Sequence, residues 1–201
     1  QTWLYLQFEA CDKIYTQNEY DLKYLKGIHP NSRFGIIRPV MDSSVLDKQK
    51  FKPIVNKTIL TGPFTVEYHG FVQTIIARNT GCEIDIPPMG VSRMPKDSWD
   101  MAENVGVNYL DYMMWKEWME NLSQYKYGYF LVPCIGAATF PLNCAYHGIP
   151  CIGVNRADTQ RLLYPLLSVD YLDLEEAIKL TKKLTTDKEF YKEVSTYATH
   201  T

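Results

Sequence analysis

The stretch at residues 129–155, YFLVPCIGAATFPLNCAYHGIPCIGVN, decides the fold of this chain. It contains an apolar run at 129–133, a turn of small residues, a short helix and a second apolar run at 149–154. Thr139 is placed to cap the helix, Pro141 suits its first turn, and Gly148 suits the position just past its end. Two buried runs joined by a short helix predict a βαβ unit in a parallel sheet.

The turn after the first of these strands is a candidate anion site. It consists of Gly136, Ala137, Ala138 and Thr139. Small residues let backbone N–H groups approach an anion at the start of a helix, and Thr139 adds a hydroxyl. The spacing matches neither G-x-G-x-x-G nor a P-loop. The alternative is a tight β-to-α turn with nothing bound.

A second candidate site follows the second strand of the unit, where Arg156, Gln160 and Arg161 lie close together in sequence. Open α/β sheets bind ligands at this carboxyl edge, and two guanidinium groups there would neutralise a diphosphate. The alternative is a solvated loop with surface ion pairs. A third candidate, Gly62 with His69, follows a predicted strand at 58–61; for a lone histidine the alternative is a structural role.

The remaining chain alternates predicted strands with predicted helices. The predicted strands are 11–16, 33–38, 58–61, 82–86 and 107–110, and the predicted helices are 18–27, 66–79, 111–122, 173–185 and 186–197. Residues 40–56 are predicted to form a linker and residues 89–107 a loop. This order predicts an α/β fold, a Rossmann-like doubly wound parallel sheet with helices on both faces.

Composition excludes several classes of function. The chain has 201 residues, 46% of them hydrophobic, and a net charge of −2, which argues against a nucleic-acid binder that relies on a basic face. No apolar run is long enough for a transmembrane segment, and no signal peptide is visible, so we expect a cytoplasmic protein. Five cysteines without C-x-x-C spacing predict reduced, buried thiols and no metal site.

The order of the pieces also carries a family resemblance. RFGIIRPVMD, KTILTGPFTVEYHG and PCIGAATFPLNCAYHGIPCIGV resemble, in turn, a crossing between two domains, a first strand with its loop, and a donor-site helix. The last of these contains an "A-x-x-G-x-P-x-I" pattern at Ala145, Gly148, Pro150 and Ile152. Together they resemble the carboxyl-terminal, donor-binding part of a glycosyltransferase with the GT-B fold, which has two Rossmann-like domains facing across a cleft.

The resemblance implies a domain organisation and a substrate class. Residues 1–45 would be a remnant of the amino-terminal domain and the hinge, and 46–201 the nucleotide-sugar-binding domain. The substrate would be a nucleotide-diphosphate sugar, with no separate cofactor and an unknown acceptor. Because the chain begins at Gln1, we expect it to be the later part of a longer protein. The isolated chain is then expected to bind donor weakly and to transfer nothing.

The resemblance also implies roles for single residues. Many retaining members place an Arg and a Lys on the phosphates where this chain has Pro63 and His69, and two glutamates where it has Ile135 and Asn143. The phosphates would therefore be bound by residues 136–139 with Arg156 and Arg161. The ribose would be bound by Asn143, and the base by Asn108, Tyr109 and Leu110. Two alternatives stay open: a nucleotide-sugar epimerase of the same fold, and a non-catalytic interaction domain that lost the site.

Overall fold

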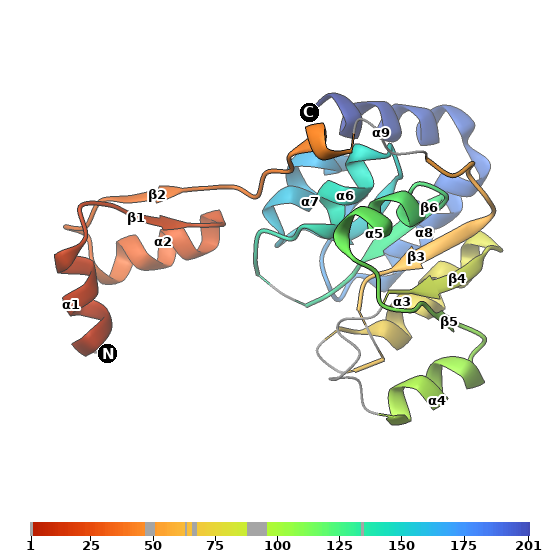
Figure 1. Cartoon of the computed structure of the whole chain (residues 1–201), viewed down its shortest axis with the longest axis horizontal. Coiled ribbons are helices and arrows are strands. Elements are labelled where there is room, and N and C mark those ends of the chain that lie inside the picture. The colour runs from red at the N-terminus through yellow and green to blue at the C-terminus, as the bar shows by residue number, and fades with distance from the viewer. Residues whose placement is uncertain (1, 47–50, 63, 66–67, 88–95, 134) are drawn as a thin grey trace.

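The fold is an α/β body with a small N-terminal unit extending from one side (Figure 1). A computed structural model describes residues 2–46, 51–62, 64–65, 68–87, 96–133 and 135–201. The body contains a six-stranded sheet in the order β5-β4-β3-β6-β7-β8, in which every neighbouring pair is parallel. The predicted fold class, a Rossmann-like parallel sheet, is therefore confirmed.

The strands of this sheet are short and their inner members are buried on both faces. Their bounds are β3 (Lys57–Leu60), β4 (Glu83–Ile86), β5 (Asn108–Tyr109), β6 (Tyr127–Phe130), β7 (Cys151–Val154) and β8 (Ser168–Val169). All four residues of β6 and of β7 are buried, as expected for central parallel strands covered by helices on both sides. The chain enters at β3, runs outward to β5, and returns to β6 on the other side of β3. The sheet thus has a topological switch point between β3 and β6.

Helices cover both faces of the sheet. They are α3 (Gly70–Ala77), α4 (Lys96–Asn104), α5 (Trp115–Leu122), α6 (Phe140–Tyr146), α7 (Asp158–Leu163), α8 (Leu174–Thr186) and α9 (Lys188–His200), with 3-10 turns η1 (Ser43–Val45), η2 (Arg78–Thr80) and η3 (Pro165–Leu167). Figure 1 shows α5 and α6 in front of the sheet, with α3 and α8 behind it. Contacts join α3 to α8, and α6 to α7 and α9, so neighbouring helices also pack on one another.

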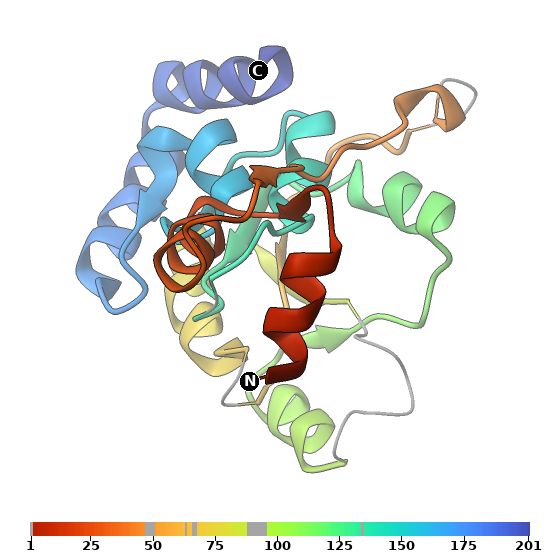
Figure 2. The same ribbon diagram turned by 90° about the vertical axis from the view of Figure 1, so that its left-hand side faces the viewer.

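The N-terminal unit contains α1 (Thr2–Ala10), β1 (Ile14–Thr16), α2 (Glu19–Ile28) and β2 (Phe34–Ile36). Its two strands form a separate parallel pair. Asn18 caps α2 as predicted, because its side chain accepts a hydrogen bond from the backbone of Asp21. Figure 2 shows this unit in front of the body, with the chain crossing from one to the other through a single extended segment.

Buried tyrosines contribute much of the core. Tyr125, Tyr129 and Tyr164 are fully buried. The Tyr129 hydroxyl shares a hydrogen bond of 2.9 Å with Thr181, and the Tyr164 hydroxyl donates to the carbonyl of Ile149 at 2.6 Å. Because these phenols are buried and paired inside the protein, the high tyrosine content reflects core packing at these positions.

Several predicted elements begin or end elsewhere. Residues 96–104 were expected to be a loop and form α4, and the polar stretch after β7 contains the helix α7. Helix α5 begins at Trp115 rather than near residue 111. The cap of α9 is Asp187, which accepts from the backbone of Phe190, and not Thr186. The two missed helices, α4 and α7, have nine and six residues, which are too few turns for a 3.6-residue pattern to identify them.

Predicted burial was wrong for some apolar residues. The apolar residues of the predicted helix at 66–79 include Phe71, Ile75 and Ile76 on one face. Ile76 is buried as expected, but Phe71 and Ile75 are about half exposed, and the polar Gln73 is buried. The cysteines also differ: Cys144 and Cys151 are buried free thiols, whereas Cys11 is exposed and Cys82 half-buried. The fifth, Cys134, lies outside the described residues.

Candidate functional site

The body contains a cavity of about 890 Å³ at the carboxyl ends of four strands. Thr61 follows β3, Pro87 follows β4, Asp111 follows β5, and Phe130 with Val132 ends β6. The cavity therefore lies across the switch point between β3 and β6, where open α/β sheets bind their ligands. Its volume is that of a typical small-molecule site.

The cavity wall is largely apolar, with a few polar groups. The apolar lining residues are Pro87, Met113, Trp118, Phe130, Val132, Pro133, Ala138 and Phe140. The polar lining residues are Thr61, Tyr68, Asp111, Thr139 and Asn143. Among the described residues of the wall, Asp111 is the single charged side chain. The wall thus suits a planar or sugar-like ligand held by hydrogen bonds, and its described part supplies no cation.

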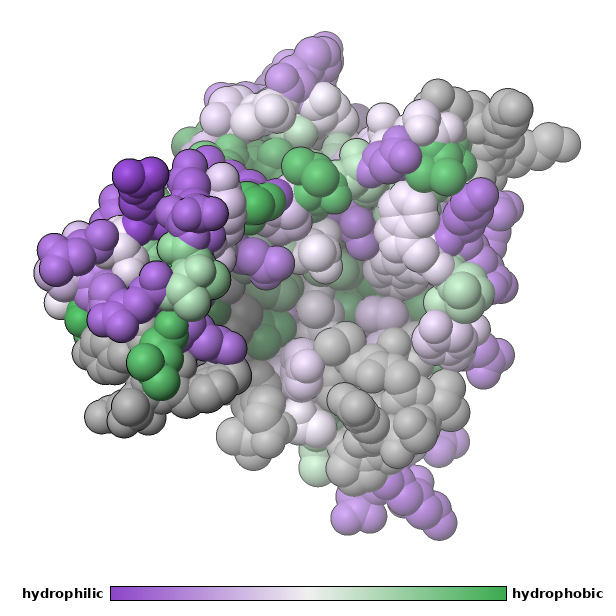
Figure 3. Space-filling view, turned by 60° about the vertical axis from the view of Figure 1, so that its left-hand side comes forward, coloured by the Kyte–Doolittle hydropathy of each residue, from purple (hydrophilic) through white to green (hydrophobic). Residues whose placement is uncertain are grey.

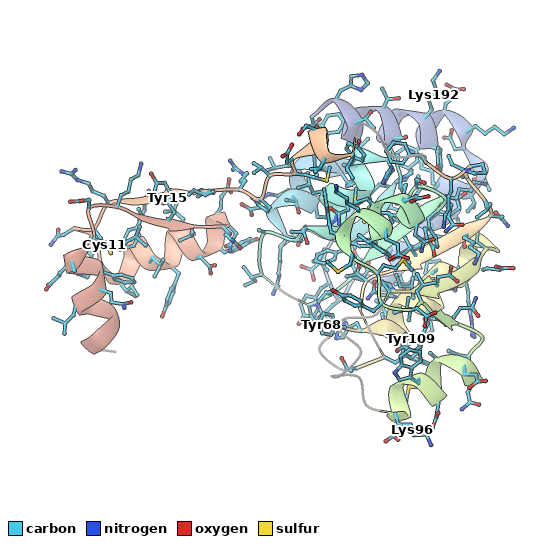
Figure 4. The ribbon with its side chains drawn as sticks, in the orientation of Figure 1. Cys11, Tyr15, Tyr68, Lys96, Tyr109 and Lys192 are labelled. Carbon is cyan, nitrogen blue, oxygen red and sulfur yellow. The ribbon has the colours of Figure 1, made fainter. Side chains whose placement is uncertain are left out.

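The space-filling view shows the surrounding surface. In Figure 3 the molecule is hollowed where the N-terminal unit meets the body, and apolar surface lies at the bottom of the hollow. Figure 4 shows Tyr68 in the loop before α3 and Tyr109 on β5, near α4. Tyr68 belongs to the cavity wall, whereas Tyr109 stacks on Trp99 with ring centroids 4.3 Å apart.

The turn between β6 and α6 has two different sides. Ala138 and Thr139 line the cavity, whereas Gly136 and Ala137 face α7. The carbonyls of Gly136 and Ala137 accept from the backbone N–H groups at the start of α7, at 3.1 and 3.2 Å. The Thr159 hydroxyl also hydrogen-bonds to the carbonyls of Ala137 and Ala138. Of the predicted anion turn, only its second half is therefore placed at the cavity.

Ala138 and Thr139 have unusual local conformations. Ala138 has a φ of 61°, a left-handed conformation that costs energy for a residue other than glycine. Thr139 occupies the N-cap position of α6, but its side chain makes no capping hydrogen bond. Thr139 therefore occupies the predicted cap position without capping the helix through its side chain, and it lines the cavity.

The arginines predicted to bind phosphate lie away from the cavity wall. Arg156 packs over the ring of Tyr171, with its guanidinium carbon 4.9 Å from the ring centroid. Arg161 forms ion pairs with Glu19 at 2.8 Å and Asp158 at 3.2 Å. Helix α7 turns Arg161 toward the N-terminal unit, and neither arginine belongs to the described lining. The bridge between Gly136 and Ala157 brings the turn at 136–139 next to Arg156, and phosphate binding by the two arginines stays a prediction.

Gln160 has a structural role. Its side chain is fully buried, and its amide donates to the carbonyls of Cys151 at 2.8 Å and Leu167 at 3.3 Å. A Cβ atom at Gly153 would lie only 2.4 Å from the Gln160 amide oxygen. Gln160 thus fills the space left by a glycine in β7 and joins strand to helix, so its predicted role in donor binding is not supported by its position.

The loop after β3 brings Tyr68, rather than His69, to the cavity. Gly62 has a φ of 86°, and a Cβ atom there would overlap the Tyr68 side chain. His69 is the N-cap of α3 with a φ of 53°, and it is absent from the described lining. Pro63 lies outside the described residues. Gly62 therefore supports the site indirectly, by letting Tyr68 pack against the backbone.

The predicted base-binding residues lie beside the cavity. Asn108 donates to the Asp85 carboxylate at 3.1 Å, and the Tyr109 hydroxyl accepts from the backbone N–H of Phe64 at 3.3 Å. Burial raises the pKa of Tyr109, and the hydrogen bond from Phe64 opposes this rise. The lining residues near this strand are Asp111 and Met113. The predicted strand leads to the cavity, whose described lining takes residues that follow it, and base binding by Asn108, Tyr109 and Leu110 stays a prediction.

Of the residues predicted to bind the donor, Ala138, Thr139 and Asn143 line the cavity, and the other described lining residues were not predicted. The missed polar residues are Thr61, Tyr68 and Asp111. One signal could have found Thr61 and Asp111, because each follows a predicted strand of the parallel sheet and strand ends meet at one edge. No comparable signal marks Tyr68, whose position depends on the loop conformation.

The described residues contain neither a membrane-spanning helix nor a cluster of metal ligands. No helix in this part of the chain is long and apolar enough to cross a membrane. Over the same described residues, no group of three or more His, Cys, Asp or Glu side chains is arranged to hold a metal ion.

Comparison with known proteins gives structural matches only. No protein-family model and no curated protein matches the chain. Among solved structures, a mutant of S. aureus TarM in complex with Fondaparinux, α-GlcNAc-glycerol and UDP matches with a TM-score of 0.76 and 8% identity, over 96% of this chain and 41% of TarM. WaaG, a glycosyltransferase involved in lipopolysaccharide biosynthesis, matches with a TM-score of 0.70 and 11% identity, over 92% and 57%.

A third match is Anabaena Alr3699/HepE in complex with UDP-glucose, with a TM-score of 0.69 and 7% identity, over 94% of this chain and 58% of that one. This chain thus spans between 41% and 58% of the length of the three structures. At such low identity the likeness concerns the fold. The chain has the α/β fold of GT-B glycosyltransferases.

Proposed function

We propose that this chain is the donor-binding part of a glycosyltransferase and that its cavity holds a nucleoside-diphosphate sugar. The observation that carries the proposal is the position of the cavity across the switch point between β3 and β6. Two of the matching structures contain UDP or UDP-glucose, which supports this class of ligand. The acceptor is unknown, and the proposal assigns residues 46–201 to donor binding and residues 1–45 to the neighbouring domain and hinge.

Different lining residues would contact different parts of the ligand. Asn143 offers an amide that can donate to and accept from sugar or ribose hydroxyls, and Thr139 adds a hydroxyl beside it. Trp118 and Phe140 provide apolar area for a base. In this proposal hydrogen bonds hold the phosphates, because the described lining contains no cationic side chain. Donor binding by the isolated chain is therefore expected to be weak.

One observation favours a second candidate, a non-catalytic interaction domain. The positions that carry Arg, Lys and two Glu residues in many members of the resembling family are Pro63, His69, Ile135 and Asn143 here. Of the three that the structure describes, only Asn143 lines the cavity; the Ile135 side chain is about half exposed. A protein that kept the fold and lost donor binding would have these features.

Thermal or chemical unfolding with uridine, guanosine and adenosine diphosphates separates the two candidates. A nucleotide present at 100 times its dissociation constant should stabilise the chain by about 2.7 kcal/mol. Asn143→Ala should weaken the binding of this nucleotide several-fold, because the substitution removes an amide from the cavity wall. Asn104→Ala, on the exposed end of α4, is the matched control and should change nothing. Absence of any shift at millimolar nucleotide would favour the interaction domain.

A further inference from the structure

The one charged group on the described cavity wall is a carboxylate, and it has no partner in the described protein. Asp111 lies between β5 and α5, is exposed, and lines the cavity. Within the described ranges no hydrogen bond or ion pair joins its side chain to another residue. An ionised carboxylate is an acceptor with two oxygens and no donor. A ligand beside Asp111 is therefore favoured if it presents N–H donors.

An aromatic wall lies in the same cavity. The rings of Trp118 and Phe140 have centroids 6.4 Å apart and planes inclined by 35°, and Phe140 stacks on Phe130 at 6.5 Å with an inclination of 21°. All three residues line the cavity. Phe130 and Phe140 are buried, whereas Trp118 is partly accessible and can pack against a flat heterocycle. Stacking on an aromatic side chain does not by itself distinguish one base from another. Selection among bases must come from an edge group.

The hydrogen-bonding edges of the bases differ in how they meet a carboxylate. Guanine presents N1–H and an N2 amino hydrogen side by side, which matches the two oxygens of one carboxylate in a bidentate pair. Uracil presents one N3–H between two carbonyl oxygens, whose lone pairs repel a carboxylate. Adenine presents an amino group beside the N1 acceptor and meets the same repulsion on one side. Asp111 thus complements guanine and opposes the other two.

We propose that the cavity selects guanine nucleotides, with the Asp111 carboxylate accepting hydrogen bonds from N1–H and N2–H of the base. This inference rests on the proposed function, since it names the base of the nucleotide that the cavity would hold. It differs from the UDP found in two matching structures, and those structures share only 7–8% sequence identity with this chain. The substrate class is then a guanosine-diphosphate sugar.

The unmodified chain provides the first test. Isothermal titration with guanosine, inosine, uridine and adenosine diphosphates compares four bases on the same diphosphate. Guanosine diphosphate should bind at least about tenfold more tightly than the uridine and adenosine compounds, the effect of one good bidentate contact. Inosine diphosphate lacks the N2 amino group and should bind several-fold more weakly than guanosine diphosphate.

Two variants with the same change in charge provide the second test. Asp111→Asn should weaken the binding of guanosine diphosphate about tenfold. The affinity for uridine diphosphate should stay equal or rise, because the new amide offers an acceptor to N3–H and a donor to O4 of uracil. Glu117→Gln, an exposed position on α5 outside the described lining, should alter neither affinity.

The outcomes separate failure of the inference from failure of the proposed function. Equal affinities for guanosine and uridine diphosphates, or for guanosine and inosine diphosphates, would overturn the guanine assignment and leave nucleotide binding intact. Binding of none of the four would overturn both. The inosine comparison needs no variant, so the inference remains testable if Asp111→Asn fails to fold.

Discussion

At the scale of single residues, the fold buries polar atoms that have no hydrogen-bond partner among the described residues. The His147 ring is packed beside Phe51 and Tyr146, and its Nε2 atom is buried with no hydrogen-bond partner among the described residues. Thr61 Oγ1 is buried in the same unpaired state. In both cases the sequence alone predicts nothing unusual, because the mismatch arises from neighbours that are distant along the chain.

His147 predicts a loss of stability in mild acid. Burial lowers its pKa to about 4, although a backbone hydrogen bond at Met119 opposes this effect. In the unfolded chain the pKa returns to about 6.5, so the unfolded state binds the proton more tightly between these values. Stability should fall as the pH falls through this window, by roughly 1 kcal/mol between pH 7 and pH 5 after allowance for partial exposure.

Urea unfolding at pH 7 and pH 5 measures the His147 contribution. His147→Gln should remove about that much of the pH dependence, whereas His200→Gln, at an exposed position near the C-terminal end, should leave it unchanged. Identical pH profiles for the His147 variant and the parent would contradict the assignment of the acid sensitivity to this ring.

Two threonines of the same segment predict opposite effects of the same substitution. Thr61→Val removes a buried hydroxyl that has no partner among the described residues, so the free energy of unfolding should stay constant or rise by up to about 1 kcal/mol. Thr58→Val removes a hydroxyl that lies 3.2 Å from the Thr80 hydroxyl, so stability should fall by about 1 kcal/mol. Chemical denaturation of both variants checks the pair. Equal losses at the two positions would show that Thr61 is hydrogen-bonded in solution.

At the scale of elements, the turns after β6 and β7 support each other. Gly136 and Ala157 form an isolated parallel bridge, and Thr159 hydrogen-bonds back to the carbonyls of Ala137 and Ala138. These bonds hold Ala138 in its left-handed conformation at the cavity wall. The shape of that part of the cavity is therefore determined by α7, an element that does not itself line it.

Thr159 provides the test of this support. Thr159→Val should lower the free energy of unfolding by about 1–3 kcal/mol, because the carbonyls of Ala137 and Ala138 lose the one hydroxyl donor that they share. Thr159→Ser retains the hydroxyl and should restore most of the difference. Denaturant unfolding of the three proteins gives the comparison. A serine variant as unstable as the valine variant would show that the hydroxyl alone does not provide the stabilisation.

At the scale of the whole molecule, a charged cluster joins the N-terminal unit to the body. Glu19 pairs with Arg161 at 2.8 Å and with Arg38 at 3.2 Å, and its backbone N–H donates to the fully buried Asp158 at 3.1 Å. Arg161 also pairs with Asp158, so one guanidinium bridges α2 and α7. These contacts join α2, and Arg38 in the segment after β2, to α7. They hold the relative orientation of the two parts.

Loss of Arg161 should loosen this junction. Arg161→Gln leaves the buried Asp158 carboxylate without its cationic partner, so stability should fall by about 1–3 kcal/mol and cleavage near residues 37–42 by a protease should become faster. Lys179→Gln breaks an exposed ion pair with Glu176 on α8 and should cost at most about 0.5 kcal/mol. Small-angle scattering of Arg161→Gln that matches the parent would show that the cluster does not hold the orientation.

From the sequence alone we could predict the parallel α/β class and most of the strands and helices after Lys57, because burial on both faces gives β6 and β7 continuous apolar runs. The sequence also located Ala138, Thr139 and Asn143, since local turn chemistry places them at the start of α6. Short elements such as α4 and α7 left too few turns to be recognised from periodicity.

Which side chains lie close together can be seen only in the tertiary structure. Arg156 and Arg161 follow a strand end as Thr61 and Asp111 do, yet the first two pack on Tyr171 and Glu19 and the last two line the cavity. The difference comes from the direction in which each loop leaves the sheet and from contacts between residues far apart along the chain. Periodicity and spacing carry information on local conformation, whereas a binding site depends on such distant contacts.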